Sequence, residues 1–151
     1  MRALGIDLGS KRIGIAISDR TGTIASPLTM IVRSGSVRRD HAAIAELVEE
    51  EEVEMVVVGL PLNMNGSVGP AAQAAMREAE ALATVVRMPV VTFDERRTTV
   101  TADRALMEGG IGAQARRKLV DKVAAAVMLQ QWLDTRASTS RSDPSTAAES
   151  P

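Results

Sequence analysis

Three acidic side chains occur at positions from which one site could be built. Asp7 ends a short apolar run, Glu95 follows another, and Asp121 lies in a helix that is otherwise nearly apolar. Acids that converge repel one another, and a bound divalent cation removes that cost. Oxygen-only ligands favour Mg²⁺ or Mn²⁺, and two such ions roughly 3.5–4 Å apart can promote phosphodiester hydrolysis. The three acids therefore indicate a metal-dependent hydrolase of phosphodiesters.

Each acid also has an ordinary structural explanation, and the sequence leaves these explanations open. Asp7 could cap the turn that follows it. Glu95 could pair with a neighbouring arginine, while Asp94 or Thr98 caps the next helix. Asp121 could pair with the cations that lie one helical turn earlier.

Basic residues occur within a few positions of each acid in the sequence. Such cations would hold a phosphate backbone without reading its bases. The loop after Gly59 contains Asn65-Gly66, an ordinary turn pair whose backbone could also face a phosphate, but it lacks the spacing of a nucleotide P-loop. The candidate nucleic-acid-binding residues are Lys11, Arg12, Asn65, Gly66, Arg96, Arg97, Thr98 and Lys122.

Composition narrows the possible chemistry further. The chain has 151 residues, with 18 Lys+Arg against 19 Asp+Glu and 45% hydrophobic residues, as expected of one globular domain. The absence of cysteine excludes disulfides, thiol catalysis and zinc–thiolate sites. The single histidine, His41, cannot form a His-rich metal site, and we interpret it as a solvated residue. Phe93 and Trp132 are the only aromatic residues, which argues against single-strand binding by base stacking.

Hydropathy gives no sign of a membrane protein. The longest unbroken apolar run, Val123 to Leu129, has seven residues and is far too short to span a bilayer. We therefore expect a soluble, cytoplasmic protein with no membrane partner.

Periodicity and turn residues indicate the elements that position these groups. The order predicts an antiparallel meander of three strands followed by βαβ crossovers, which means a mixed α/β sheet of five strands with helices on both faces. Pro27 suggests that the third strand lies at an edge or contains a bulge. The expected domain covers residues 1–134, and a polar, disordered tail covers 135–151. The predicted strands are 2–8, 12–18, 23–32, 54–59 and 89–93, and the predicted helices are 37–52, a segment ending near 86, 98–108 and 114–134.

Ligand sites in such sheets gather at the carboxyl ends of strands. In this sequence that rule selects Asp7, the loop after Gly59, and the pair Asp94-Glu95. The candidate acids from the strands should therefore meet at one end of the sheet.

Four sequence blocks resemble the YqgF family, also called RuvX. They occur in the family's order and span about residues 3–134. The blocks are Asp7–Ala16, Val58–Pro61 with Asn65–Ser67, Asp94–Arg96 with Thr98-Thr99, and Asp121–Ala125.

The resemblance implies a three-layer RNase H-like fold related to the RuvC resolvases. It also implies a cytoplasmic nuclease of ribosome biogenesis that processes the 5′ end of pre-16S rRNA, with Asp7, Glu95 and Asp121 as the family's acids. At position 97 this sequence has arginine, whereas leucine is more usual in the family pattern: Arg97 is the departure. Relatives of this fold commonly use four acids, and Asp94 is the candidate for the fourth. The expected partners are precursor rRNA and the ribosome, and the protein would be a monomer or a homodimer.

Other functions remain open at this point. A Holliday junction resolvase would use the same chemistry on branched DNA and should be dimeric. A non-catalytic RNA- or ribosome-binding module would keep the acids for structural reasons. Sugar kinases and actin-like ATPases also begin with an Asp-x-Gly hairpin, but they need a duplicated domain that one domain of this length cannot supply.

Overall fold

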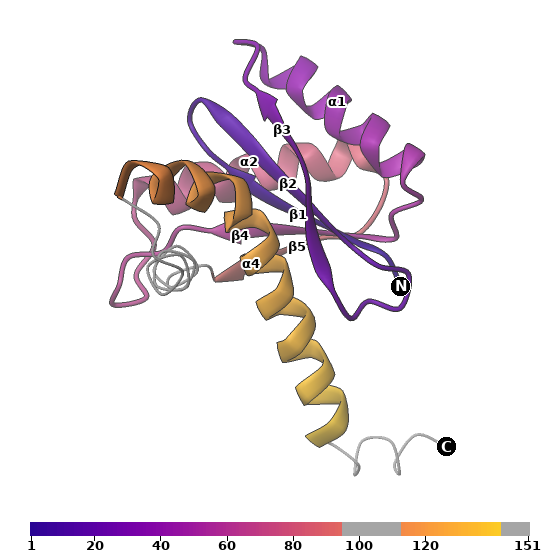
Figure 1. Cartoon of the computed structure of the whole chain (residues 1–151). Coiled ribbons are helices and arrows are strands. Elements are labelled where there is room, and N and C mark those ends of the chain that lie inside the picture. The colour runs from indigo at the N-terminus through magenta and orange to yellow at the C-terminus, as the bar shows by residue number, and fades with distance from the viewer. Residues whose placement is uncertain (95–112, 143–151) are drawn as a thin grey trace.

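The protein folds around one five-stranded mixed sheet with helices on both faces (Figure 1). The computed structural model describes the backbone of residues 1–94 and 113–142, with the side chains of 1–94 and 123–137. Within these ranges the elements are β1 (Ala3–Leu8), β2 (Arg12–Ser18), β3 (Ala25–Val32), α1 (Val37–Glu50), β4 (Met55–Leu60), α2 (Pro70–Val86), β5 (Val90–Asp94) and α4 (Ala113–Ser142).

The strands lie in the order β3-β2-β1-β4-β5. β1, β2 and β3 form an antiparallel meander, whereas β4 runs parallel to β1 and β5 runs parallel to β4. This arrangement confirms the predicted mixed sheet. β3 is an edge strand, as Pro27 suggested, and the β2–β3 register shifts beside Pro27, which is paired with Ala16.

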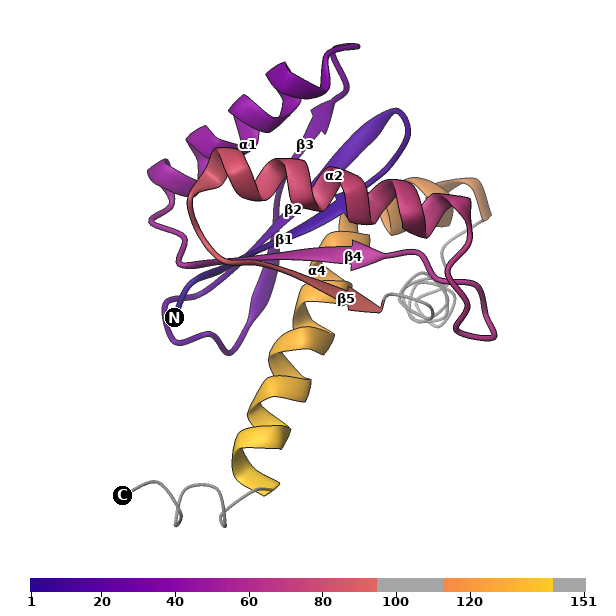
Figure 2. The same ribbon diagram turned by 180° about the vertical axis from the view of Figure 1, so that it is seen from behind.

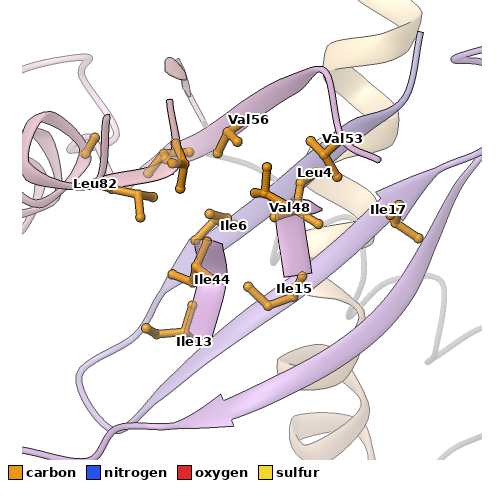
Figure 3. Packing of buried hydrophobic residues seen from close by; sticks show 13 residues of the cluster. Leu4, Ile6, Ile13, Ile15, Ile17, Ile44, Val48, Val53, Val56 and Leu82 are labelled. Carbon is orange, nitrogen blue, oxygen red and sulfur yellow. The ribbon is translucent and has the colours of Figure 1, made fainter. Parts of the chain in front are cut away.

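Strand alternation divides the core into two layers. On one face, Ile6, Ile13 and Ile15 pack together with Ile44 of α1 (Figure 3). On the other face, small residues such as Ala3 leave room for α4 to approach closely. β4 is buried on both faces, which explains why its sequence is continuously apolar. Figures 1 and 2 show α4 across one face of the sheet and α1 with α2 across the other.

The last helix, α4, runs antiparallel to β1. Arg136 contacts Met1 at the start of the chain, with 2.9 Å between Nη1 and Sδ. Further along β1, a Cβ on Gly5 would lie only 2.8 Å from the Cβ of Leu129 and 3.3 Å from the carbonyl oxygen of Ala125. Glycine at this position thus allows α4 to pack directly on the strand.

Helix α4 is longer than the sequence suggested. We predicted its end at Asp134, but the helix continues to Ser142. The guanidinium of Arg136 lies 5.4 Å from the centre of the Trp132 ring, one turn earlier, and this contact favours a helical backbone past Asp134. The first eight residues of the expected tail are therefore helical. The rest of that tail, 143–151, and the predicted helix 98–108 lie outside the described residues.

None of the helices in the described part of the chain has the length and apolar character needed to span a bilayer.

Candidate functional site at the carboxyl ends of the strands

Asp7 lies near the carboxyl end of β1 and is half-buried. Across the sheet its register neighbour is Gly14 on β2, and the neighbour of Gly14 is Met30 on β3. Residues in register point to the same face, which is here the face that α4 covers. A cavity of about 350 Å³ at this position is lined by Asp7, Gly14 and Met30.

Two cations line the same cavity as Asp7. Lys11 and Arg12 belong to the β1–β2 hairpin, and both are exposed. The hairpin turns at Gly9, whose N–H donates to the carbonyl oxygen of Arg12 at 3.0 Å. A Cβ on Gly9 would lie 2.5 Å from that oxygen, so only glycine fits. A carboxylate beside two solvated cations can hold both a metal ion and a phosphate.

The α4 turn that contains Asp121 lies at the level of Asp7. Gly5 packs against Ala125 and Leu129, and α4 runs antiparallel to β1. Two strand residues lead from Gly5 to Asp7, a rise of about 6.6 Å. Four helix residues lead from Ala125 back to Asp121, a rise of about 6 Å. The backbone therefore carries Asp121 toward the end of the sheet where Asp7 lies, while its side chain is outside the described residues.

Asp94, the candidate for a fourth acid, lies on the other face of the sheet. It pairs in register with Leu60, one position beyond the pair of Phe93 and Gly59. Phe93 packs in the layer beneath α4, whereas Val90 packs beneath α1 and α2. By alternation Asp94 belongs to the face of Val90, opposite the face of Asp7.

Several predicted site residues lie wholly or partly outside the described part of the chain. Glu95, Arg96, Arg97 and Thr98 lie outside the described residues. Lys122 lies on α4, and only its backbone is described. These assignments therefore stay predictions.

The loop between β4 and α2 is closed by its own hydrogen bonds. The N–H of Gly66 donates to the carbonyl oxygen of Asn63 at 2.7 Å. The side-chain oxygen of Asn65 accepts from the N–H of Ser67 at 2.9 Å and from its hydroxyl at 2.7 Å. A phosphate bound by the Gly66 N–H would have to replace an existing bond, so the turn explanation of Asn65-Gly66 has direct structural support. Figure 1 shows this loop, the β1–β2 hairpin and the start of α4 at the same end of the sheet.

Comparison with known proteins assigns the family. The model of the RuvX family, described as Holliday junction resolvase, matches residues 1–135. The chain belongs to the RuvX family. A protein of Caldanaerobacter subterraneus subsp. tengcongensis named "Putative pre-16S rRNA nuclease" is 49% identical over 137 residues, which cover 90% of this chain and 98% of the relative. A protein of the same name from Myxococcus xanthus is 46% identical over 134 residues, covering 89% of this chain and 88% of the relative.

The fold of this RuvX-family chain is also that of RuvC. The T. thermophilus RuvC structure in complex with a Holliday junction substrate matches with a TM-score of 0.57 at 19% identity, covering 92% of this chain and 97% of that chain. A second T. thermophilus RuvC structure matches with a TM-score of 0.53 at 19% identity, covering 92% of this chain and 98% of that chain. These matches confirm the predicted RNase H-like fold.

Of the three acids predicted to bind metal, Asp7 is the one whose side chain the structure describes. Among the described side chains, no three acidic or histidine side chains come together as a group that could hold an ion. Asp7 offers the hard oxygen donor that Mg²⁺ and Mn²⁺ prefer, at a half-buried position beside a cavity. The other two acids of the predicted set, Glu95 and Asp121, have side chains outside the described residues. The donor chemistry of Asp7 thus fits the predicted cofactor.

His41 is buried, and our interpretation of it as a solvated residue is wrong. Its exposed fraction is 2%, and its Nε2 lies 2.9 Å from Oε2 of Glu78 on α2. The missed pattern is its spacing with Ile44 and Val48, at i+3 and i+7, which places all three on one stripe of α1 facing the core. The imidazole of His41 tolerates burial because Glu78 is its hydrogen-bond partner.

Proposed function

We propose that this RuvX-family protein is a metal-dependent endonuclease that hydrolyses phosphodiester bonds near the 5′ end of precursor 16S rRNA. The observation that carries the proposal is the cavity shared by Asp7, Lys11 and Arg12 at the carboxyl end of β1. It lies on the sheet face covered by α4, level with the turn that holds Asp121. The names of the RuvX relatives support a nuclease and suggest this RNA.

In this proposal Asp7, Glu95 and Asp121 hold one or two Mg²⁺ or Mn²⁺ ions, which when bound activate water and stabilise the leaving oxygen. The position of Asp7 is fixed because its strand, β1, is paired with β2 on one side and with β4 on the other. Lys11 and Arg12 attract the phosphate backbone and hold the reacting phosphate near the acids. The hairpin thus positions the substrate while the sheet and α4 position the acids.

Cleavage of branched DNA is the second candidate function. It is favoured by the description of the family model and by the likeness of the fold to RuvC. The two activities would share the same acids, because contacts to phosphate do not distinguish RNA from DNA.

We expect the purified protein to cleave a precursor rRNA leader in the presence of Mg²⁺ and to leave a four-way DNA junction intact. Chelation with EDTA should abolish cleavage, and added Mg²⁺ or Mn²⁺ should restore it. The measurement is gel analysis of end-labelled substrates, together with the oligomeric state by light scattering. Symmetric cleavage of the junction by a dimer, with the RNA intact, would favour the resolvase. Cleavage of the leader that persists in EDTA would contradict metal dependence.

We expect Lys11→Ala to weaken substrate binding and to reduce its dependence on salt. Loss of one phosphate contact should lower the slope of log K against log salt by about 0.7 to 0.9. The matched control is Arg20→Ala, because Arg20 is also exposed but lies beyond the opposite end of β2 and pairs with Glu52. Binding measured by fluorescence anisotropy at several salt concentrations tests this. Equal slopes for the wild type and Lys11→Ala would argue against a phosphate contact at Lys11.

A further inference from the structure

A largely buried polar cluster joins α1, α2 and the end of β3. It consists of Arg33, His41 and Glu78, which we call the Arg33 cluster. Arg33 follows β3 and makes two parallel bonds to Glu78, with Nη1 to Oε2 at 2.8 Å and Nη2 to Oε1 at 3.0 Å. His41 Nε2 lies 2.9 Å from the same Oε2. The side chains of Arg33, Glu78 and His41 are only 17%, 16% and 3% exposed.

The Arg33 cluster reaches the hairpin of the candidate site. Nε of Arg33 donates to the carbonyl oxygen of Gly9 at 2.9 Å, and its backbone N–H donates to the carbonyl oxygen of Lys11 at 2.9 Å. The N–H of Gly9 is bonded in turn to the carbonyl oxygen of Arg12. Both polar groups of Gly9 are therefore held, one inside the hairpin and the other by Arg33.

The cluster and the cavity lie on opposite faces of the sheet. Asp7 faces α4, whereas Arg33 bonds to Glu78 of α2 beside His41 of α1. Arg33 thus supports the hairpin from behind, and its guanidinium is already occupied by Glu78 and Gly9. From this position we assign Arg33 a supporting role rather than a direct contact with the phosphate.

The charge and the directed hydrogen bonds of Arg33 explain why a polar cluster, and not an apolar one, supports the hairpin. Burying ions is costly, and apolar side chains would join α1 to α2 as well or better. An apolar side chain, however, cannot hold a backbone carbonyl, whereas a guanidinium fixed by a bidentate carboxylate points its Nε–H in one direction. Ser34 and Asp40 complete the surroundings, with the Ser34 N–H donating to Oδ1 of the buried Asp40 at 3.1 Å.

The charges in the cluster are mutually stabilised. The hydrogen bond to Glu78 raises the pKa of Arg33 above its usual value. Burial alone would raise the pKa of Glu78, but hydrogen bonds from Arg33 and His41 outweigh it and lower that pKa. The Arg33–Glu78 pair therefore stays ionised except in acid.

We propose that Arg33 is a positioning residue for the proposed nuclease. Fixed by Glu78, which His41 also bonds, it holds the β1–β2 hairpin so that Lys11 and Arg12 keep their place beside Asp7. This inference rests on the proposed function. Because a misplacement of about 1 Å can cost up to 100-fold in rate, a loosened hairpin should slow the chemical step more than it weakens substrate binding.

The test compares Glu78→Gln with the wild type in two measurements. In the first, cleavage kinetics should show kcat reduced about tenfold or more, with KM changed less than threefold. In the second, hydrogen exchange followed by NMR should show the Gly9 amide exchanging about tenfold faster, with the amide of Val57 in the buried β4 unchanged. The matched control is Glu52→Gln, which removes the carboxylate of the exposed Arg20–Glu52 pair and should alter neither measurement.

Arg33→Lys is a second test variant, and it keeps the test usable if Glu78→Gln fails to fold. It keeps the positive charge but cannot bond Gly9 and both oxygens of Glu78 at once. It should reproduce the loss of kcat and the faster exchange at Gly9.

Two results would overturn the positioning role. One is unchanged exchange at Gly9 in both variants. The other is equal acceleration at Gly9 and Val57 with an unchanged kcat, which would mean that the cluster serves stability alone. If the wild type cleaves neither RNA nor DNA, the proposed function fails, and the exchange comparison still decides whether the Arg33 cluster holds the hairpin.

Discussion

Asp7→Asn should reduce metal-dependent cleavage by more than about 100-fold, since loss of groups that merely support metal ligands already costs 10- to 100-fold. The amide keeps the size of the side chain but loses the negative charge that binds a cation. Because Asp7 is half-buried at the edge of a cavity, the fold should tolerate the change. The melting temperature should stay within about 4 °C of the wild type. Initial cleavage rates and thermal unfolding of the purified variant measure both effects.

Asp94→Asn is the informative comparison, because Asp94 ends β5 on the opposite face of the sheet. We expect its effect on cleavage to be less than tenfold. A loss as large as that of Asp7→Asn would show that Asp94 is a fourth acid of the site despite its register. Unchanged cleavage by Asp7→Asn would rule out the proposed site. A wild type that binds RNA without cutting it, and an Asp7 variant that only loses stability, would favour the non-catalytic module.

Gly5→Val should lower the free energy of unfolding by about 3 kcal/mol, the upper part of the usual range for overpacking. Even a single Cβ at this position would lie 2.8 Å from the Cβ of Leu129 and 3.3 Å from a backbone oxygen of α4. Neither atom is the flexible end of a side chain, so α4 must move away from β1. Because α4 carries Asp121, cleavage should also fall. Urea denaturation and the cleavage rate measure the two effects.

Gly35→Ala is the matched glycine control. Gly35 has a φ of 88°, and a Cβ there would have no atom within 4 Å among the described residues. Its cost should therefore come only from the left-handed backbone, about 1 to 2 kcal/mol. Gly5→Ala should be milder than Gly5→Val. A Gly5→Val protein as stable as Gly35→Ala would contradict the close packing of α4 on β1.

The sheet could be predicted because local patterns specify it. Alternating isoleucines define β2, a continuous valine run defines the doubly buried β4, and Pro27 marks the edge strand. The short turns between the first three strands require antiparallel pairing, and the intervening helices require parallel pairing of β4 and β5. Connection length and periodicity thus determine most of the topology.

The Arg33 cluster could not be predicted because its members are distant in the sequence. Arg33 and Glu78 are 45 residues apart, and nothing in the local sequence links them. A charged residue that follows a strand usually reaches solvent. Only the packing of α2 against α1 brings Glu78 to Arg33 and His41. The spacing of His41 with Ile44 was the one available indication of its burial.

The end of α4 was misjudged for a related reason. Residues 135–142 are polar and rich in serine and threonine, a composition typical of disorder. The contacts of Arg136 with Trp132 and Met1 are not visible in composition. For the site, the sequence identified Asp7 and its neighbouring cations, which share a cavity, but it did not indicate that Gly14 and Met30 line the same cavity.

The most direct test of the central claim is a crystal structure of the protein with Mn²⁺, in which anomalous scattering locates the ions. The account predicts manganese at the carboxyl end of β1, with oxygens of Asp7, Glu95 and Asp121 all within about 2.5 Å of one or two ions. Manganese bound by Asp7 alone, or acids too far apart to contact a common ion or adjacent ions, would contradict it.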